Sequence, residues 1–150
     1  MAELTQSRVR ELFNYDEGTG ALIWRPRPRE EFRSESHWAR FNAHIAGKEA
    51  GTVQQTNSGV SYKRVFFGRK SYANHKVIWL YVHGHWLEHD IDHKNRCGID
   101  NRLENLRIAT KSQNSANRVF KNRVGLKGAY RQKGRDTYYS MIRVERKAIY

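Results

Sequence analysis

The chain has little cysteine, little proline, few acidic residues and no long apolar run. Among its 150 residues there are one cysteine and two prolines. A lone cysteine, Cys97, excludes an intrachain disulfide and an all-cysteine zinc site. No run approaches the roughly 20 apolar residues that cross a bilayer, and the opening residues lack the apolar segment of a signal peptide. We therefore expect packing alone to support folding, in a cytoplasmic, intracellular protein with no membrane contact.

Positive charge is what the sequence has in excess. Lys and Arg number 28 against 15 Asp and Glu, which gives a net charge of +13. Such an excess favours a polyanionic partner, and nucleic acid is the first candidate. Hydrophobic residues make up 38% of the chain, enough for the core of one modest domain or two small ones. A single large enzyme domain is excluded.

Apolar spacing and turn residues predict an α+β fold. A short helix capped by Thr5 and a strand ending near Trp24 open the chain. Strands are predicted at 52–53 and 62–67, followed by a buried helix over 72–83 that Gly84 ends. Residues 25–48 fit either an irregular loop or a short helix around Trp38, and the pattern does not choose between them.

The most informative stretch begins at Ile91. A strand ending in Asp92-His93, a loop and a second strand over 106–109 are predicted there. Thr110 stands three residues before Gln113, the spacing of a capping box, so a helix is expected from 110 to about 120. The topology is strand, loop, strand, helix.

This stretch carries the residue types that phosphodiester hydrolysis needs. His93 has the chemistry of a general base, and Asn105 would hold its tautomer by accepting the Nδ1 proton. Asp92 and Asn114 would give two oxygens to a divalent ion, and such a set suits Mg²⁺ or Mn²⁺ better than zinc. A mixed zinc site is conceivable, but its possible ligands lack paired short spacings: Cys97, His93, His89 and His85. His75 is interpreted as a packed, hydrogen-bonded histidine.

Residues 91–118 resemble the HNH nuclease motif, the strand-strand-helix (ββα) metal finger of homing and bacteriophage-type endonucleases. The stretch from Tyr72 to Trp79 and the opening of the chain are also similar to that group. The resemblance implies His93 as general base, Asn105 as its orienting residue, and one Mg²⁺ or Mn²⁺ per active site on Asp92 and Asn114. The paired CxxC motifs of many relatives are absent, so no structural zinc is expected.

The last 33 residues concentrate the positive charge. From residue 118 onward there are ten Lys or Arg against two acids, a net charge of +8. Three short strands are predicted, at 128–130, 138–144 and 148–150. This tail is similar to the start of the DNA-binding domain of plant ethylene-response factors, and we expect that domain to be incomplete. The predicted DNA contacts are Asn117, Arg118, Lys121, Arg123, Lys127, Arg131, Lys133, Arg135 and Tyr138.

These observations predict a metal-dependent DNA endonuclease of homing or phage type. A small antiparallel sheet and helices would lead into the metal finger at about 88–120, within a nuclease domain of residues 1–118. A basic β-rich tail of residues 119–150 would follow. The substrate would be double-stranded DNA, cut by a monomer or a homodimer that nicks or breaks both strands. The alternative is a noncatalytic protein that clamps DNA with the finger and the tail. The target sequence cannot be read from the chain.

Overall fold

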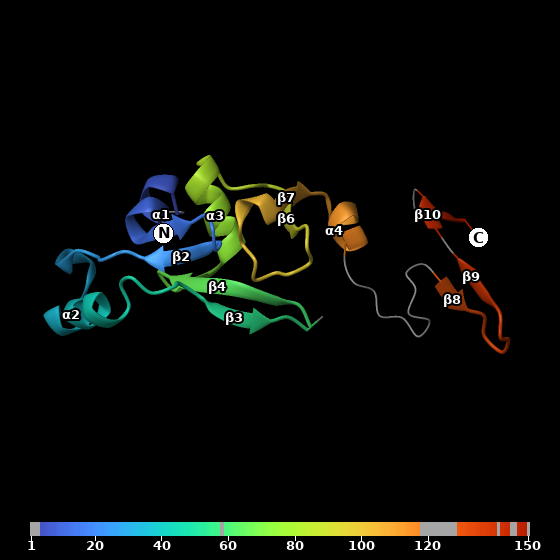
Figure 1. The fold of residues 1–150 in the computed structure, drawn as a ribbon, viewed down its shortest axis with the longest axis horizontal. Coiled ribbons are helices and arrows are strands. Elements are labelled where there is room, and N and C mark those ends of the chain that lie inside the picture. Colours follow the sequence, from blue (N-terminus) through green and yellow to red (C-terminus); the bar gives the residue numbers. More distant parts are fainter. Residues whose placement is uncertain (1–3, 58, 118–128, 141, 145–146, 150) are drawn as a thin grey trace. The chain divides into compact units, whose positions relative to one another are not determined.

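The structure is a computed structural model that describes residues 4–57, 59–117, 129–140, 142–144 and 147–149. The chain forms two compact units, Met1–Asn117 and Arg118–Tyr150. The described residues contain four α-helices and several small antiparallel sheets, which confirms the predicted α+β class (Figure 1). Across those residues, we find no helix with the length and apolar character that a membrane span requires.

The first unit opens with a short helix and a hairpin. Helix α1 (Gln6–Leu12) begins after Thr5, whose side chain accepts a hydrogen bond from Arg8 N, as predicted. Strands β1 (Phe13–Asp16) and β2 (Ala21–Trp24) pair antiparallel, with Asp16 opposite Ala21. The backbone at Gly20 has φ +74°, a conformation that favours glycine.

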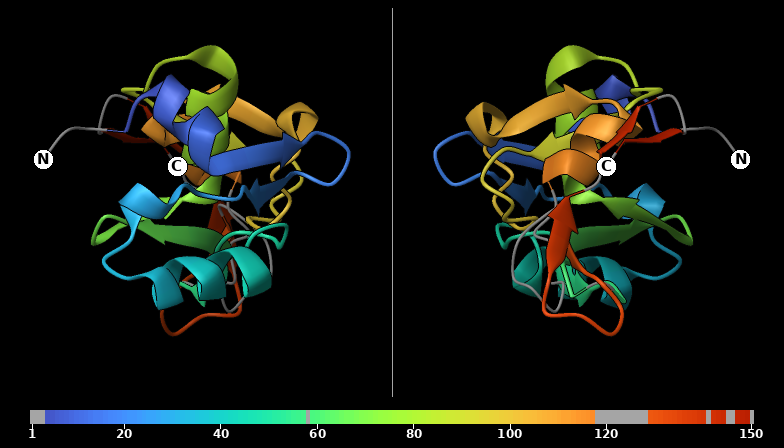
Figure 2. Two further views of the ribbon diagram at one scale, coloured as in Figure 1. Left: turned by 90° about the vertical axis from the view of Figure 1, so that its left-hand side faces the viewer. Right: turned by 90° about the vertical axis from the view of Figure 1, so that its right-hand side faces the viewer.

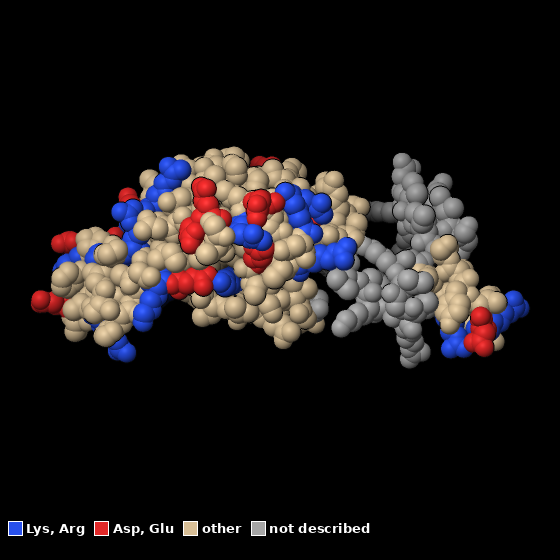
Figure 3. Space-filling view, viewed as in Figure 1, with Lys and Arg blue, Asp and Glu red and all other residues tan. Residues whose placement is uncertain are grey.

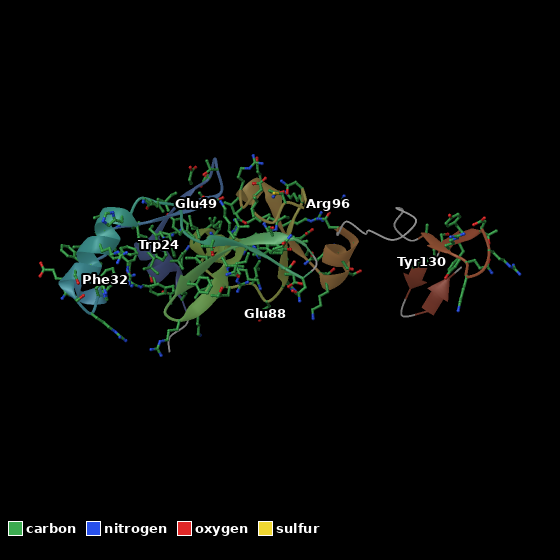
Figure 4. The ribbon with its side chains drawn as sticks, turned by 90° about the horizontal axis from the view of Figure 1, so that it is seen from below. Trp24, Phe32, Glu49, Glu88, Arg96 and Tyr130 are labelled. Atoms are coloured by element: carbon green, nitrogen blue, oxygen red, sulfur yellow. The ribbon has the colours of Figure 1, made fainter. Side chains whose placement is uncertain are left out.

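Residues 25–48, for which the sequence allowed either a loop or a short helix, contain a helix. A 3₁₀ turn, η1 (Arg29–Glu31), is followed by α2 (Glu35–His44), so the alternative of a helix around Trp38 is confirmed. The helix buries none of its residues fully, and aromatic contacts hold it in place. Figure 4 shows Trp24 and Phe32 beside α2, and both rings pack on Phe41 at 5.6 Å and 5.3 Å between centroids.

A three-stranded sheet follows, with β4 in the centre. Its strands are β3 (Thr52–Gln55), β4 (Ser61–Phe67) and β5 (Lys70–Ala73). Gly68 and Arg69 connect β4 to β5 with φ values of +56° and +68°, as a tight two-residue hairpin loop requires. The predicted start of the next helix at 72 is wrong, because Tyr72 and Ala73 pair with β4. Helix α3 therefore spans Asn74–His83, and Gly84 ends it in the left-handed conformation.

The last part of the first unit is a hairpin followed by a helix. Strands β6 (Asp90–His93) and β7 (Leu106–Ala109) pair antiparallel, and the turn η2 (Leu103–Asn105) precedes β7. Helix α4 (Lys111–Asn117) begins with the predicted capping box. Gln113 N donates to Thr110 Oγ1 at 3.2 Å, and Thr110 N donates to Gln113 Oε1 at 2.9 Å. The predicted extension of this helix to 120 lies outside the described residues.

One hydrophobic core joins these pieces. Helices α1 and α3 lie side by side, α3 packs on the β4–β5 hairpin, and α4 contacts β6 and β7 (Figures 1 and 2). The strand that ends in Asp92-His93 is therefore fixed between α3 and α4. The most buried core side chains come from five elements: Val9, Leu12, Phe13, Leu22, Val65, Val77, Ile78 and Leu80.

The described residues of the second unit form two antiparallel strand pairs. Strands β8 (Ala129–Arg131) and β9 (Tyr138–Ser140) pair antiparallel, as do β10 (Ile142–Val144) and β11 (Lys147–Ile149). The predicted strand over 138–144 corresponds to β9 and β10, and residue 141 between them lies outside the described residues. Gly134, at φ +79°, lies in the turn between β8 and β9.

Candidate active site on the β6–β7 hairpin

Asp92 and His93 are buried at the end of β6 and contact different surroundings. Asp92 is 6% exposed and His93 is 4% exposed. Successive side chains of a strand point to opposite faces. The Asp92 carboxylate accordingly contacts β7 and α4, whereas the His93 ring contacts β4, α3 and the loop after β6.

The His93 ring has one polar partner and two aromatic neighbours. Its Nε2 lies 3.1 Å from Asn101 Oδ1. The Tyr62 ring lies 5.9 Å from it, and the His75 ring contacts it edge to face at 5.1 Å and 90°. Burial lowers the pKa of His93, although the hydrogen bond to Asn101 acts in the opposite direction. The imidazole is therefore neutral near pH 7, the state in which it can accept a proton.

His75 is buried directly beneath the candidate base. Burial is the main cause that lowers the pKa of His75 to about 3, and the neighbouring His93, Lys76 and Arg64 add to it. The interpretation of a packed residue is confirmed. The expected hydrogen bonding is incomplete, because His75 Nδ1 is buried without a partner among the described residues. The His75 ring that contacts His93 is therefore uncharged near neutral pH.

The Asp92 carboxylate is held by two side chains. Arg107, its cross-strand neighbour, donates to Oδ2 from Nε at 3.0 Å and from Nη2 at 2.7 Å. Asn117 Nδ2, at the end of α4, lies 3.0 Å from each carboxylate oxygen and 2.8 Å from His93 O. Arg96 Nε donates to Asn117 Oδ1 at 3.3 Å, and Figure 4 shows Arg96 beside α4.

Asn105 holds the loop that follows His93. Its Oδ1 accepts from Asn95 N at 2.9 Å, and its Nδ2 donates to Asp100 O at 2.7 Å. Lys94 N donates to the Asn105 carbonyl at 2.8 Å. Both ends of the amide are therefore engaged by loop backbone, and the ring nitrogen of His93 is met instead by Asn101.

The same loop is stiffened by an ion pair. Arg102 donates to both oxygens of Asp100, at 2.9 Å and 2.8 Å, and Asn95 Nδ2 donates to Asp100 Oδ2 at 2.7 Å. The hydrogen bond from Arg102 lowers the pKa of Asp100 to about 2. The loop also meets the first hairpin. Tyr15 Oη donates to Asn101 O and accepts from Leu103 N, both at 3.1 Å.

The two residues predicted to hold a metal ion, Asp92 and Asn114, lie on β6 and α4, and these two elements contact each other. Asn114 is half-buried on α4, one turn before Asn117, so both side chains lie on the same side of the helix. The donor set is one carboxylate and one amide, which fits a hard divalent cation whose remaining ligands are water and phosphate oxygens. Within the described part of the chain, no group of three or more His, Cys, Asp or Glu is arranged to hold a metal ion.

The predicted DNA-contacting residues fall into three groups. Asn117 lies at the active site, against Asp92. In the β8–β9 hairpin, Arg131 pairs with Asp136, Lys133 and Arg135 are exposed, and Tyr138 is 59% exposed. The Tyr130 and Tyr139 rings stack at 5.6 Å in this hairpin. The predicted contacts at residues 118, 121, 123 and 127 lie outside the described residues.

Basic side chains also gather near the candidate site. In Figure 3, positive and negative side chains lie in scattered groups on the visible face of residues 4–117. Positive ones cluster toward the end where β7 and α4 lie. Arg107 is 44% exposed at its side chain although it is bonded to the buried Asp92. The region around Asp92 therefore presents positive charge to a polyanion.

Three residues of the site were not recognised in the sequence: Asn101, Arg107 and Tyr62. Asn101 had a signal, because it is a polar residue in the short loop between the two predicted strands. Arg107 could have been found from strand pairing, since a register that places Leu106 opposite His93 also places Arg107 opposite Asp92. Tyr62 had no such signal, because its contact with His93 depends on how the sheet folds onto the hairpin.

Comparison with known protein families agrees with this location. Residues 72–116 match the family model described as HNH endonuclease. The match runs from β5 to α4 and includes Asp92, His93, Asn105 and Asn114. No curated protein and no solved structure matches the chain. An HNH endonuclease domain is thus present at 72–116, and it supports a nuclease function with nucleic acid as the substrate.

Proposed function

We propose that the protein is a metal-dependent DNA endonuclease of homing or bacteriophage type with one active site per chain. The observation that carries the proposal is the pair Asp92 and His93. A buried, neutral imidazole with one nitrogen held by Asn101 lies next to a carboxylate that faces an amide-bearing helix. This combination offers a proton acceptor and an oxygen ligand side by side, as hydrolysis of a phosphodiester requires.

His93 acts as the general base. A water molecule attacks phosphorus and gives its proton to the neutral ring, while the bond from phosphorus to the 3′ oxygen breaks. The departing 3′ oxygen takes a proton from solvent water, and the products therefore carry a 5′-phosphate and a 3′-hydroxyl. Asn105 supports this role through the loop, because its amide fixes the backbone at Asn95 and Asp100. Asn105 therefore orients His93 through the backbone of the loop that follows it, and not through a hydrogen bond to the ring.

Asp92 and Asn114 are the proposed ligands of one Mg²⁺ or Mn²⁺. Bound there, the ion would stabilise negative charge that develops on the phosphate and the departing oxygen. Asp92 Oδ2 carries two hydrogen bonds from Arg107 and one from Asn117, whereas Oδ1 carries the bond from Asn117 alone. Oδ1 therefore has the greater remaining capacity for a cation. Arg107 and Asn117 keep the carboxylate in place.

Double-stranded DNA is the proposed substrate, inside the cell. The net charge of +13 supports phosphate binding, and the β8–β9 hairpin adds exposed cations beside stacked tyrosines. One site cuts one strand in each encounter, so a monomer would nick, and a homodimer could break both strands.

The test is nicking of a supercoiled plasmid with Mg²⁺, with Mn²⁺ and with EDTA. Wild-type protein should convert the plasmid to the nicked form only with the metal, and His93→Ala should lower the rate by at least about 100-fold. His89→Ala is the matched control, because His89 is an exposed histidine four residues earlier. An undiminished rate in His93→Ala would refute the role of His93.

The same experiment separates the alternative function. A protein that binds plasmid and duplex DNA but cuts no substrate with any divalent ion would be a noncatalytic clamp. The ion pair of Asp92 with Arg107 is the observation compatible with that outcome, since a structural carboxylate would be neutralised in the same way.

A further inference from the structure

Asn101 is the most deeply buried polar residue that contacts the candidate base. It is 1% exposed and lies in the loop between β6 and η2. Its Oδ1 is 3.1 Å from His93 Nε2. An amide oxygen only accepts hydrogen bonds, so this contact requires the proton of the neutral ring to be on Nε2. Nδ1 is then the nitrogen with the free lone pair.

The other end of the Asn101 amide shows that packing alone does not explain the residue. Asn101 Nδ2 is buried without a hydrogen-bond partner among the described residues. A buried donor that lacks a partner destabilises the folded state, a cost that an apolar side chain of similar volume avoids. The compensating contribution is the single bond to His93.

The surroundings hold both partners of this bond in place. The Asn101 backbone is fixed by Tyr15, and the absent side chain of Gly20 allows the first hairpin to pack against it. A Cβ at Gly20 would lie 2.6 Å from Asn101 C. The His75 and Tyr62 rings contact the imidazole, with centroids at 5.1 Å and 5.9 Å, and leave it little room to turn.

We propose that Asn101 is the positioning residue of His93. Its side-chain oxygen keeps the proton on Nε2, so that the opposite nitrogen, Nδ1, is offered to the attacking water. In this arrangement the Asn105 side chain forms hydrogen bonds with the loop backbone, and the Asn101 side chain forms one with the His93 ring. The inference rests on the proposed role of His93 as base.

The direct test is the tautomer of His93 in the full-length, metal-free protein. Long-range ¹H–¹⁵N correlation spectra distinguish a protonated from an unprotonated ring nitrogen. Wild-type protein should show His93 protonated at Nε2. Asn101→Leu should give a mixture of both tautomers, and Asn101→Asp, which keeps an acceptor oxygen, should restore the Nε2 proton. Asn14→Leu makes the same chemical change at an exposed position of β1 and should leave the tautomer unchanged.

Cleavage kinetics provide the second readout. Asn101→Leu should reduce kcat by about 10–100-fold with little change in KM for DNA, as expected for a residue that orients a catalytic group without contacting substrate. A wild-type ring protonated at Nδ1 overturns the inference, and so does a folded Asn101→Leu protein with an unchanged tautomer. The wild-type spectrum decides even where the leucine variant fails to fold. Because the spectra need no activity, failure of the nuclease proposal is seen separately, in the plasmid assay.

Discussion

At the scale of single residues, His75 links the active site to stability. It is a buried neutral histidine whose ring contacts His93 and whose pKa is lowered to about 3 from 6.5. Between these two values the unfolded chain binds a proton that the folded protein does not. The contribution of His75 is therefore complete above about pH 6.5 and declines as the pH falls toward 3, by at most about 1.4 kcal/mol per pH unit. Burial lowers the pKa of His93 as well, which acts in the same direction.

This leads to a test by urea unfolding at about pH 7.5 and pH 5. His75→Phe keeps an aromatic ring against His93 but cannot take up a proton. Its unfolding free energy should fall less than that of the wild type between the two pH values. His89→Phe, an exchange at an exposed histidine, should retain the wild-type dependence. Equal slopes for wild type and His75→Phe would contradict the role given to burial of this ring.

The sequence was most informative about residues whose chemistry is unusual for their position. Asp92 and His93 ended a strand, and their joint pattern with Asn105 and Asn114 was the reason to place a site there. The side chains that contact Asp92 and His93 were harder to predict. Asn105 and Asn101 are amides four residues apart near the same loop, and only the folded geometry shows which one meets the ring and which one meets the backbone.

At the scale of elements, α4 is the piece on which the proposed metal site depends. Its described part has seven residues, a length at which a helix gains little from its own hydrogen bonds. Its capping box and its contacts with β6 and β7 must therefore hold it in place. Asn114 and Asn117 both lie on this helix.

Removal of the cap should show this dependence. Thr110→Ala takes away the oxygen that Gln113 N donates to, and we expect the unfolding free energy to fall by about 1 kcal/mol. Thr110→Ser keeps the hydroxyl and should remain close to wild type. Chemical denaturation measures both variants, and plasmid nicking should decline with the alanine variant only. Equal losses for serine and alanine would show that the methyl group of Thr110, and not its hydroxyl, supports α4.

Elements with a local signal were predicted well, and those defined by pairing were not. Thr5, Gly84 and the Thr110–Gln113 box each mark a helix end by chemistry that is readable in a few residues. Tyr72 and Ala73 suit a helix by composition, yet β4 recruits them into a strand. Such choices depend on residues that are distant in the chain.

At the scale of the whole molecule, charge is distributed unevenly along the chain. Residues 118–150 carry a net charge of +8 out of +13. If the tail binds phosphates, its removal should weaken DNA binding and reduce the salt dependence, with little effect on the chemistry at His93.

A double variant, Lys133→Gln with Arg135→Gln, tests this division. Fluorescence anisotropy with a DNA duplex should show weaker binding. The slope of log affinity against log salt should decrease by about one for each phosphate that the variant no longer neutralises. Arg40→Gln with Lys48→Gln removes the same charge from exposed positions of the first unit. A matching decrease in both proteins would show that total charge matters and that the hairpin has no special role.

The first hairpin packs against the loop between β6 and β7, so the candidate site depends on residues that are far from it in the sequence. Tyr15 bonds to Asn101 and Leu103, and a side chain at Gly20 would lie 2.4 Å from Arg102 N. Tyr62, from the central sheet, closes the other side of the His93 ring. Tyr15, Gly20 and Tyr62 all precede residue 72, where the family match begins. The stretch 72–116 therefore contains the proposed base and the proposed metal ligands without the residues of the first hairpin and the central sheet that contact their surroundings. Grafted onto another scaffold, it would transfer these groups but not their alignment, so the smallest portable unit of the candidate site starts near the N-terminus.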